Sequence, residues 1–170
     1  MSNLLNKAEK IKLIIFDVDG VFTDGKIYYT NNGDEIKAFD IQDGLGIKML
    51  LNAGVEIAII TGRNSKIVER RMQELGVRYC YQGEKNKLIR YEELKNILNL
   101  DDNEIAMVGD DLLDLPIIQK AGFGITVANA ASGMTNYADW QTVKSGGHGA
   151  VREICELILT AQNKWPQFDA

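Results

Sequence analysis

The stretch IKLIIFDVDGVFTDG, residues 11–25, decides the fold of this chain. Its first part, residues 11–16, is mostly apolar, which predicts a strand that is buried on both faces of a sheet. Asp17, Asp19 and Asp24 follow this strand within eight residues. Carboxylates that crowd together repel one another, so an acidic group at the end of a buried strand requires a compensating feature elsewhere in the chain.

Beyond this stretch, apolar segments of strand length alternate with segments of helical periodicity. Further strands are predicted at residues 55–60, 77–81, 104–108, 122–127 and 140–143. Helices are predicted at residues 43–52, 65–75, 86–98, 112–121 and 149–163, with a short one near 130–138. This alternation predicts an α/β fold: a doubly wound, Rossmann-like parallel sheet with helices on both faces, in a single domain over residues 1–170.

A β-hairpin is the one predicted element that breaks the alternation. The segments IYY and EIKAF flank the turn NNGD, whose Asn and Gly tolerate positive φ, so we expect a hairpin insertion at about residues 26–40. It follows the first strand and therefore emerges at the carboxyl edge of the sheet, which is where open α/β sheets bind ligands.

Composition excludes several classes of protein. The 170 residues are 45% hydrophobic and carry a net charge of −5, which argues against a nucleic-acid partner. No apolar run reaches the ~18 residues of a membrane span, and the N-terminus lacks the apolar region of a signal peptide, so we expect a cytoplasmic protein with no membrane partner. Cys80 and Cys155 lie far apart and, with one histidine, give little support for zinc.

Polar residues that can take part in chemistry follow each of the first four strands. They are Asp17 and Asp19 after the first, Thr61, Gly62 and Arg63 after the second, Lys87 near the third, and Asp110, Asp111 and Asp114 after the fourth. Each alone has a structural explanation: Asp and Gly make turns, acids favour the first turn of a helix, and Thr caps helices. The whole set, meeting at one edge of a sheet, indicates a catalytic site.

This set suits phosphoryl transfer. Carboxylates near one point favour a hard cation such as Mg²⁺, which also offsets the acidity of the protein toward an anionic substrate. Asp17 is then the candidate nucleophile on phosphorus, and Asp19 the candidate acid and base. Thr61 and Lys87 are placed to bind the phosphoryl oxygens and neutralise their charge.

The four segments DVDG, TGR, Lys87 and GDDLLD are similar to the four motifs of the haloacid dehalogenase superfamily of phosphotransferases. The resemblance implies that Asp17 is the nucleophile and a Mg²⁺ ligand, and that Asp19 is the acid/base and binds the metal through its carbonyl. It also implies that Asp110 is the third protein ligand of the metal, and that Asp111 or Asp114 supports the ligands without binding the metal directly.

A narrower resemblance covers more of the chain. The segments DVDGVFTDGKIYY, IQDGLGIKMLLNAGVEIAIITGRNS, YQGEKNKLI and GGHGAVREICELIL resemble the bacterial 3-deoxy-D-manno-octulosonate 8-phosphate (Kdo-8-phosphate) phosphatases that lack a cap domain. About two dozen residues separate Asp19 from Asp43, which is too few for a large cap. The resemblance implies a phosphoric monoester hydrolase of lipopolysaccharide biosynthesis that uses Mg²⁺ and forms a homotetramer with the hairpin at the subunit contact.

Substrate recognition is predicted from the basic residues. A sugar acid carries a carboxylate, which a guanidinium binds in a bidentate manner, so Arg63 and Arg71 are the candidates. A nine-carbon sugar-acid 9-phosphate remains an alternative substrate. The stretch SGGHGAVRE either presents backbone N–H groups to an anion or forms a packed loop and cap. The aromatic residues Trp165 and Phe168 either cover the site of a neighbouring subunit or belong to a terminus that is only partly ordered.

Three other classes of protein are weighed against a phosphatase. A receiver-type signalling domain shares the acids, Thr, Lys and Mg²⁺, but its phosphorylated Asp ends the third strand, and VRYCYQG has none. A dinucleotide-binding domain would need a third glycine in GLGIKM and a place directly after the first strand. A noncatalytic assembly module would not require the complete set of acids, threonine and lysine.

Overall fold

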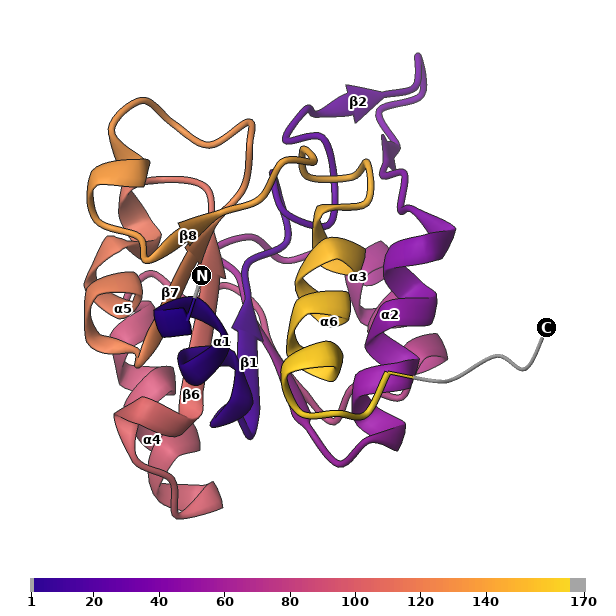
Figure 1. Cartoon of the computed structure of the whole chain (residues 1–170). Helices are drawn as coiled ribbons and strands as arrows, with labels where there is room; N and C mark the ends of the chain where they lie inside the picture. The colour runs from indigo at the N-terminus through magenta and orange to yellow at the C-terminus, as the bar shows by residue number, and fades with distance from the viewer. Residues whose placement is uncertain (1, 166–170) are drawn as a thin grey trace, which may run out of the picture.

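A computed structural model describes residues 2–165, and its main sheet has six parallel strands around β1 (Figure 1). In spatial order the strands are β5 (Tyr79–Tyr81), β4 (Glu56–Ile60), β1 (Leu13–Phe16), β6 (Ile105–Gly109), β7 (Phe123–Thr126) and β8 (Trp140–Gln141). The chain therefore builds outward from β1 in one direction and then, from β6 onward, in the other. The predicted doubly wound parallel sheet is confirmed.

Helices cover both faces of this sheet (Figure 1). One face packs against α1 (Ser2–Glu9), α2 (Ile41–Asn52), α3 (Lys66–Leu75) and α6 (Ala150–Ala161), and the other against α4 (Lys87–Leu98) and α5 (Leu115–Lys120). Along β1, Ile14 and Phe16 join the first core and Leu13 and Ile15 the second, and all four are 0% exposed. Each such side chain contributes about 1.5–3 kcal/mol on burial, which explains the continuous apolar run before the acids.

The hairpin forms a separate antiparallel pair, β2 (Tyr28–Tyr29) and β3 (Glu35–Ile36), beyond the carboxyl edge of the main sheet (Figure 1). Asp24 organises its start: Oδ1 accepts a hydrogen bond from the Lys26 backbone N–H at 3.0 Å, and Oδ2 accepts one from the Tyr28 hydroxyl at 2.5 Å. Asp24 thus belongs to the hairpin and not to the acidic group at the end of β1.

The glycines of GLGIKM serve helix packing. A Cβ on Gly44 would lie 2.3 Å from Arg71 Nη2, and one on Gly46 would lie 3.0 Å from Cys155 Sγ. Buried Asp43 links the same helices, because its Oδ1 accepts a hydrogen bond from the Arg152 N–H at 2.7 Å, near the start of α6. The motif therefore lies where α2 packs against α3 and α6, and not in a phosphate-binding loop after β1.

Two predicted helices differ from the structure, and one helix of the structure was not predicted. The segment at 112–121 divides into a 3₁₀ turn, η2 (Leu112–Asp114), and α5, because Pro116 has no N–H to donate to the Leu112 carbonyl. The segment near 130–138 is only the 3₁₀ turn η3 (Met134–Asn136), which begins after Gly133 at φ 90°. Helix α1 was not predicted. A further 3₁₀ turn, η1 (Asp102–Glu104), precedes β6.

The end of the described chain folds back onto the domain. The Arg152 guanidinium carbon lies 5.2 Å from the centre of the Trp165 ring, so this aromatic side chain packs on its own subunit. Phe168 lies outside the described residues. Across residues 2–165, none of the helices combines the length and apolarity that crossing a membrane requires.

Candidate active site

The strand register brings three acids together at the carboxyl edge of the sheet. Phe16 at the end of β1 lies beside Ile59 of β4 and Val108 of β6, so Asp17 and Asp110 leave neighbouring strands at nearly the same level. One carboxylate oxygen each from Asp17, Asp110 and Asp114 lies within 4.8 Å of the others. The predicted meeting of Asp17 with the acids that follow β6 is therefore present in the structure.

Lys87 supplies the cation of this acidic cluster. It begins α4, where the Asn86 side chain caps the helix, and it is only 5% exposed. Its Nζ lies 2.6 Å from Asp114 Oδ1 and 3.0 Å from Asp17 Oδ1. Burial alone would lower the pKa of Lys87, but the carboxylates of Asp114 and Asp17 raise it, so the side chain stays charged.

One lysine does not balance three acids. Burial, followed by the charge of Asp114, raises the pKa of Asp17 to about 6. Burial, followed by the charges of Asp17 and Asp114, raises the pKa of Asp110 to about 7. Asp17 Oδ1 also lacks a well-aligned hydrogen bond despite its ion pair with Lys87. Oxygen-only donors with excess negative charge fit a hard divalent ion such as Mg²⁺, which would be held by Asp17 and Asp110.

Asp114 and Asp111 act differently in the same turn. Asp114 is 1% exposed, and its Oδ2 accepts hydrogen bonds from the Asp110 N–H at 3.1 Å and the Asp111 N–H at 3.4 Å. It therefore positions both Lys87 and the backbone of Asp110. Asp111 is exposed, and its Oδ1 accepts from the Leu112 N–H at 2.7 Å. Of the two predicted supporting residues, Asp114 has the contacts that this role requires, and Asp111 caps η2.

The Asp19 carboxylate does not join the acidic cluster. It forms an ion pair with Lys37 Nζ, and Arg63 Nε lies 3.7 Å from its Oδ2. Glu35 bridges the two cations, with its Oε1 at 2.6 Å from Arg63 Nη2 and 3.5 Å from Lys37 Nζ. The Asp19 side chain is thus engaged by Lys37 and Arg63, and the expectation that Asp19 binds a metal through its carbonyl stays a prediction.

Glu35 and Lys37 were missed by the sequence reasoning. Only Ile36 separates them in EIKAF, and side chains at positions i and i+2 of an extended strand point to the same face. That spacing, in a hairpin placed at the carboxyl edge of the sheet, was the signal for both. Their contacts with Asp19 and Arg63 make the hairpin part of the site of its own chain.

Thr61, Gly62 and Arg63 continue directly from β4. Thr61 is 3% exposed, and its backbone bonds to the end of β5 and to the segment after it: its N–H donates to the Tyr81 carbonyl, and its carbonyl accepts from the Glu84 N–H. Arg71 lies elsewhere, within α3. Its guanidinium carbon is 5.9 Å from the Phe39 ring centre and its Nη1 is 3.6 Å from Glu74, so its contacts are not with the acidic cluster.

The glycine-rich loop before α6 packs on the loop that follows Asp19. The Gly147 N–H donates to the Val21 carbonyl at 3.1 Å, and a Cβ on Gly146 would lie 1.8 Å from the Gly20 carbonyl oxygen. Asn129 joins the two loops: its Nδ2 donates to the Gly20 carbonyl at 3.1 Å and its Oδ1 accepts from the Gly146 N–H at 2.6 Å. These contacts favour the packed-loop interpretation of SGGHGAVRE. Sequence reasoning gave no sign of Asn129.

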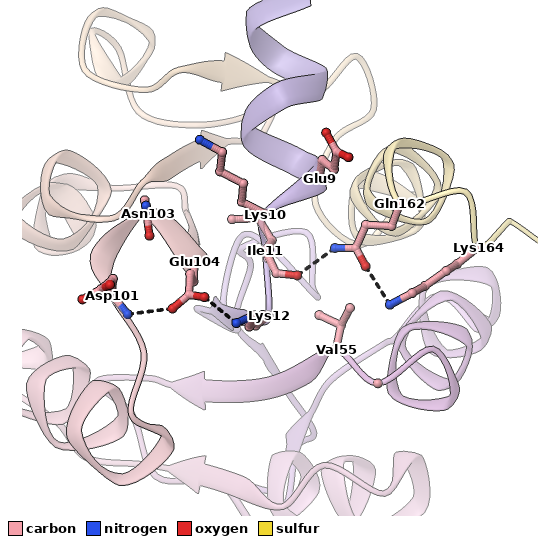
Figure 2. Close-up of a pocket in the computed structure, with 11 residues that line it drawn as sticks. Glu9, Lys10, Ile11, Lys12, Val55, Asp101, Asn103, Glu104, Gln162 and Lys164 are labelled. Atoms are coloured by element: carbon pink, nitrogen blue, oxygen red, sulfur yellow. Dashed lines mark hydrogen bonds and ion pairs between the residues drawn. The ribbon is translucent and has the colours of Figure 1, made fainter.

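A hollow of about 440 Å³ lies at the opposite edge of the sheet (Figure 2). It is lined by residues that precede strands, including Lys12 before β1 and Val55 before β4. Several of its polar groups pair with one another: Lys12 bonds Glu104 at 2.5 Å, and Gln162 Nε2 donates to the Ile11 carbonyl at 2.7 Å. These contacts join the end of α6 to the segment before β1. The hollow lies away from the acidic cluster.

The raised pKa values of the acids predict how metal affects stability. Without metal, folded Asp17 and Asp110 hold protons up to pH values of about 6 and about 7, whereas 3.8 is the ordinary value. Between about pH 4 and pH 7 the folded state binds more protons, so the free energy of unfolding falls as pH rises. Because Mg²⁺ competes with these protons, we expect it to raise Tm more at about pH 7.5 than at about pH 5.

Thermal unfolding in EDTA and in excess Mg²⁺, at both pH values, measures this effect. The Asp110→Asn variant is the matched test, because it removes one acid and should lose most of the Mg²⁺-dependent increase in Tm. If Mg²⁺ raised the Tm of the wild type equally at the two pH values, the assignment of the metal to these acids would be contradicted.

Comparisons with known proteins agree with this geometry. Residues 79–154 match the family model of the haloacid dehalogenase-like hydrolases. The 3-deoxy-D-manno-octulosonate 8-phosphate phosphatase KdsC of Salmonella typhi is 48% identical over 163 residues, which cover 96% of this chain and 87% of that protein.

Solved structures extend the likeness to three dimensions. The Moraxella catarrhalis 3-deoxy-D-manno-octulosonate 8-phosphate phosphatase, determined with magnesium ion, phosphate ion and KDO, matches with a TM-score of 0.93 and 47% identity, covering 96% of this chain and 94% of that one. The cobalt-bound Haemophilus influenzae phosphatase matches with a TM-score of 0.89 and 40% identity, covering 93% and 92%. Fold, site and relatives agree, and the chain belongs to the 3-deoxy-D-manno-octulosonate 8-phosphate phosphatase family of haloacid dehalogenase-like hydrolases.

Proposed function

We propose that this chain is a Mg²⁺-dependent phosphatase that hydrolyses Kdo-8-phosphate to Kdo and inorganic phosphate, as a step of lipopolysaccharide biosynthesis. The observation that carries the proposal is the arrangement of Asp17, Asp110, Asp114 and Lys87 at the carboxyl edge of the sheet, in a chain 48% identical to a phosphatase named for this substrate. The receiver-domain alternative loses its basis, because β5, the third strand of the alternation, ends in Tyr81 and the candidate phosphorylated residue follows β1.

In the first chemical step, Asp17 attacks phosphorus. A new bond forms between its carboxylate oxygen and phosphorus, while the bond from phosphorus to the sugar oxygen breaks. Asp19, protonated, gives its proton to that leaving oxygen, so the sugar departs as a neutral alcohol. Lys87 lies 3.0 Å from Asp17 Oδ1, where it both orients the nucleophile and faces the phosphoryl charge.

In the second step, Asp19 takes a proton from water, which attacks the aspartyl-phosphate and releases inorganic phosphate. The Thr61 hydroxyl and the backbone N–H of Gly62 are the candidate donors to the phosphoryl oxygens, since the Thr61 N–H is taken by the Tyr81 carbonyl. Bound Mg²⁺ supplies charge neutralisation for the phosphoryl group. Burial of Asp17 and Lys87 keeps these charges in a low-dielectric site, where they act more strongly than in water.

A screen of phosphate monoesters tests the substrate. We expect kcat/KM for Kdo-8-phosphate to exceed that for a nine-carbon sugar-acid 9-phosphate, and that for a hexose 6-phosphate without a carboxylate, by at least about tenfold each. The Arg63→Met variant should reduce the difference in kcat/KM between the sugar acid and the hexose, because Arg63 is the candidate ligand of the carboxylate. A higher kcat/KM for the nine-carbon substrate would contradict Kdo-8-phosphate as the substrate and favour the nine-carbon sugar acid.

We further propose that the chain forms a homotetramer through the hairpin. Ile27, Tyr29 and Ile36 are 51%, 66% and 51% exposed on this small element, and Ile41 beside it is 84% exposed. Without a cap, the site also depends on another surface to exclude water. Light scattering should therefore give a mass of about four chains, and Tyr29→Lys together with Ile36→Lys should yield smaller species. An active wild-type monomer would contradict this assembly.

A further inference from the structure

We propose that Lys37 is a positioning residue for the general acid: the hairpin lysine holds the Asp19 side chain in the place from which, once it carries a proton, it gives that proton to the leaving oxygen. The inference rests on the proposed phosphatase function and adds to it a residue outside the four sequence motifs. It gives the hairpin a role in the chemistry of its own chain, separate from any role in assembly.

The burial and contacts of Lys37 carry the inference. Its side chain is 2% exposed, although the hairpin that bears it is largely exposed. Its Nζ pairs directly with Asp19 Oδ1, and Glu35 Oε1 lies 3.5 Å away. Burying an ammonium group is costly unless it is paired. Lys37 has two carboxylates around it. It is therefore a buried, paired charge, unlike an ordinary hairpin lysine that is surrounded by solvent.

The other cation near Asp19 is less suited to this role. Arg63 Nε lies 3.7 Å from Asp19 Oδ2, and its side chain is 42% exposed. Its shorter contact, 2.6 Å, joins Nη2 to Glu35. Lys37 is therefore the group that fixes Asp19, whereas Arg63 is bound mainly by Glu35 and remains open toward solvent and substrate.

The position of the Asp19 carboxylate has a chemical consequence. A carboxylate free to turn could approach the cluster of Asp17, Asp110 and Asp114, where it would add a fourth acid, and it would no longer face the leaving oxygen. The ion pair with Lys37 keeps it apart from that cluster. Loss of Lys37 should therefore slow the first chemical step, because proton donation to the leaving oxygen becomes less effective, while Asp17 and Lys87 remain in place.

Leaving groups of different basicity isolate this effect. Phenolate needs protonation as it departs, whereas p-nitrophenolate is stable as an anion and needs little. Phenyl phosphate and p-nitrophenyl phosphate share the same phosphoryl group and carry no carboxylate, so direct contacts of Lys37 with a sugar acid do not enter the comparison. The ratio kcat/KM reports the steps up to phosphoryl transfer to Asp17, before the shared hydrolysis of the intermediate.

The experiment compares Lys37→Met with the wild-type enzyme in Mg²⁺. We expect kcat/KM to fall by about 10- to 100-fold for phenyl phosphate, and by less than about threefold for p-nitrophenyl phosphate. Lys37→Arg, which keeps the charge, should recover part of the phenyl phosphate activity. The control is Lys26→Met in the same hairpin, where the lysine is 71% exposed and 3.9 Å from Asp24; it should leave both substrates unchanged.

Equal losses for the two substrates, or no loss for either, would overturn the inference. If Lys37→Met does not fold by circular dichroism, Lys37→Gln takes its place with the same expectation. In an Asp19→Asn background, Lys37→Met should add less than about a twofold loss, since the two residues act as one unit, and additive losses would also overturn it. A wild-type enzyme that hydrolyses no phosphate monoester would instead refute the proposed function.

Discussion

Replacing Asp17 by asparagine is expected to lower kcat/KM for phosphate monoesters by about 10⁴-fold or more, because removal of a nucleophile costs losses of this order or larger. Asparagine has nearly the same shape as aspartate, so the contact between the Asp17 N–H and the Val108 carbonyl at 3.0 Å should remain. The carboxylate oxygen that would carry the phosphoryl group is absent, and the amide is a poor nucleophile.

The same substitution should not destabilise the metal-free fold at neutral pH. The pKa of Asp17 is raised to about 6 by burial and by the charge of Asp114, so its ionised form opposes folding at about pH 7.5. Asp17→Asn should therefore unfold at the same or a higher temperature than the wild type in EDTA, while losing much of the stabilisation by Mg²⁺. Activity and stability then change in opposite directions, which separates a catalytic from a structural effect.

Mass spectrometry of acid-quenched reactions provides the direct measurement. The wild-type enzyme should carry one phosphoryl group on the peptide that contains residue 17, and Asp17→Asn should carry none. Asp101→Asn is a suitable control, because Asp101 lies at the opposite edge of the sheet (Figure 2). Turnover by Asp17→Asn within about tenfold of the wild type would exclude Asp17 as the nucleophile.

The part of the site that the sequence predicts is the part that depends on strand order. Asp17, Thr61 and Asp110 each follow a strand, and parallel strands place their carboxyl ends at one edge whatever the details of packing. Lys87 was predictable in the same way, because it begins the helix after β5. A periodic pattern was enough to place Asp17, Asp110 and Lys87 together and to put Thr61 at the same edge of the sheet.

Glu35, Lys37 and Asn129 depend instead on how irregular segments fold back. The path of the hairpin over β1 brings Lys37 to Asp19, and that path is set by local bonds such as those of Asp24. Asn129 reaches Gly20 across 109 residues of sequence. The spacing of Glu35 and Lys37 places them on one face of the hairpin, but what that face meets depends on the path of the hairpin. Asn129 has no such periodic signal. The misplaced helix at 112–121 has a different cause, since the effect of Pro116 was overlooked.

Replacing Lys87 by methionine is expected to have the second-largest effect, and on both stability and activity. Methionine fills a similar volume but leaves Asp114, which is 1% exposed, without its cation at 2.6 Å. Breaking a buried ion pair on one side typically costs about 3–5 kcal/mol, because the remaining charge stays buried and unpaired. Loss of a positioned charge facing the phosphoryl group should also lower kcat/KM by about 10²- to 10³-fold.

Mg²⁺ separates these two effects of the Lys87→Met substitution. The ion would neutralise Asp17, one of the two acids that pair with Lys87, so it should restore part of the lost stability, as measured by urea unfolding with and without metal. It should not restore activity, since the ammonium group that orients Asp17 is still missing. The neighbouring Lys85 is exposed, and Lys85→Met should change neither quantity. If Mg²⁺ recovered activity together with stability, Lys87 would serve only to hold the acids in the fold, and its place at the phosphoryl group would be withdrawn.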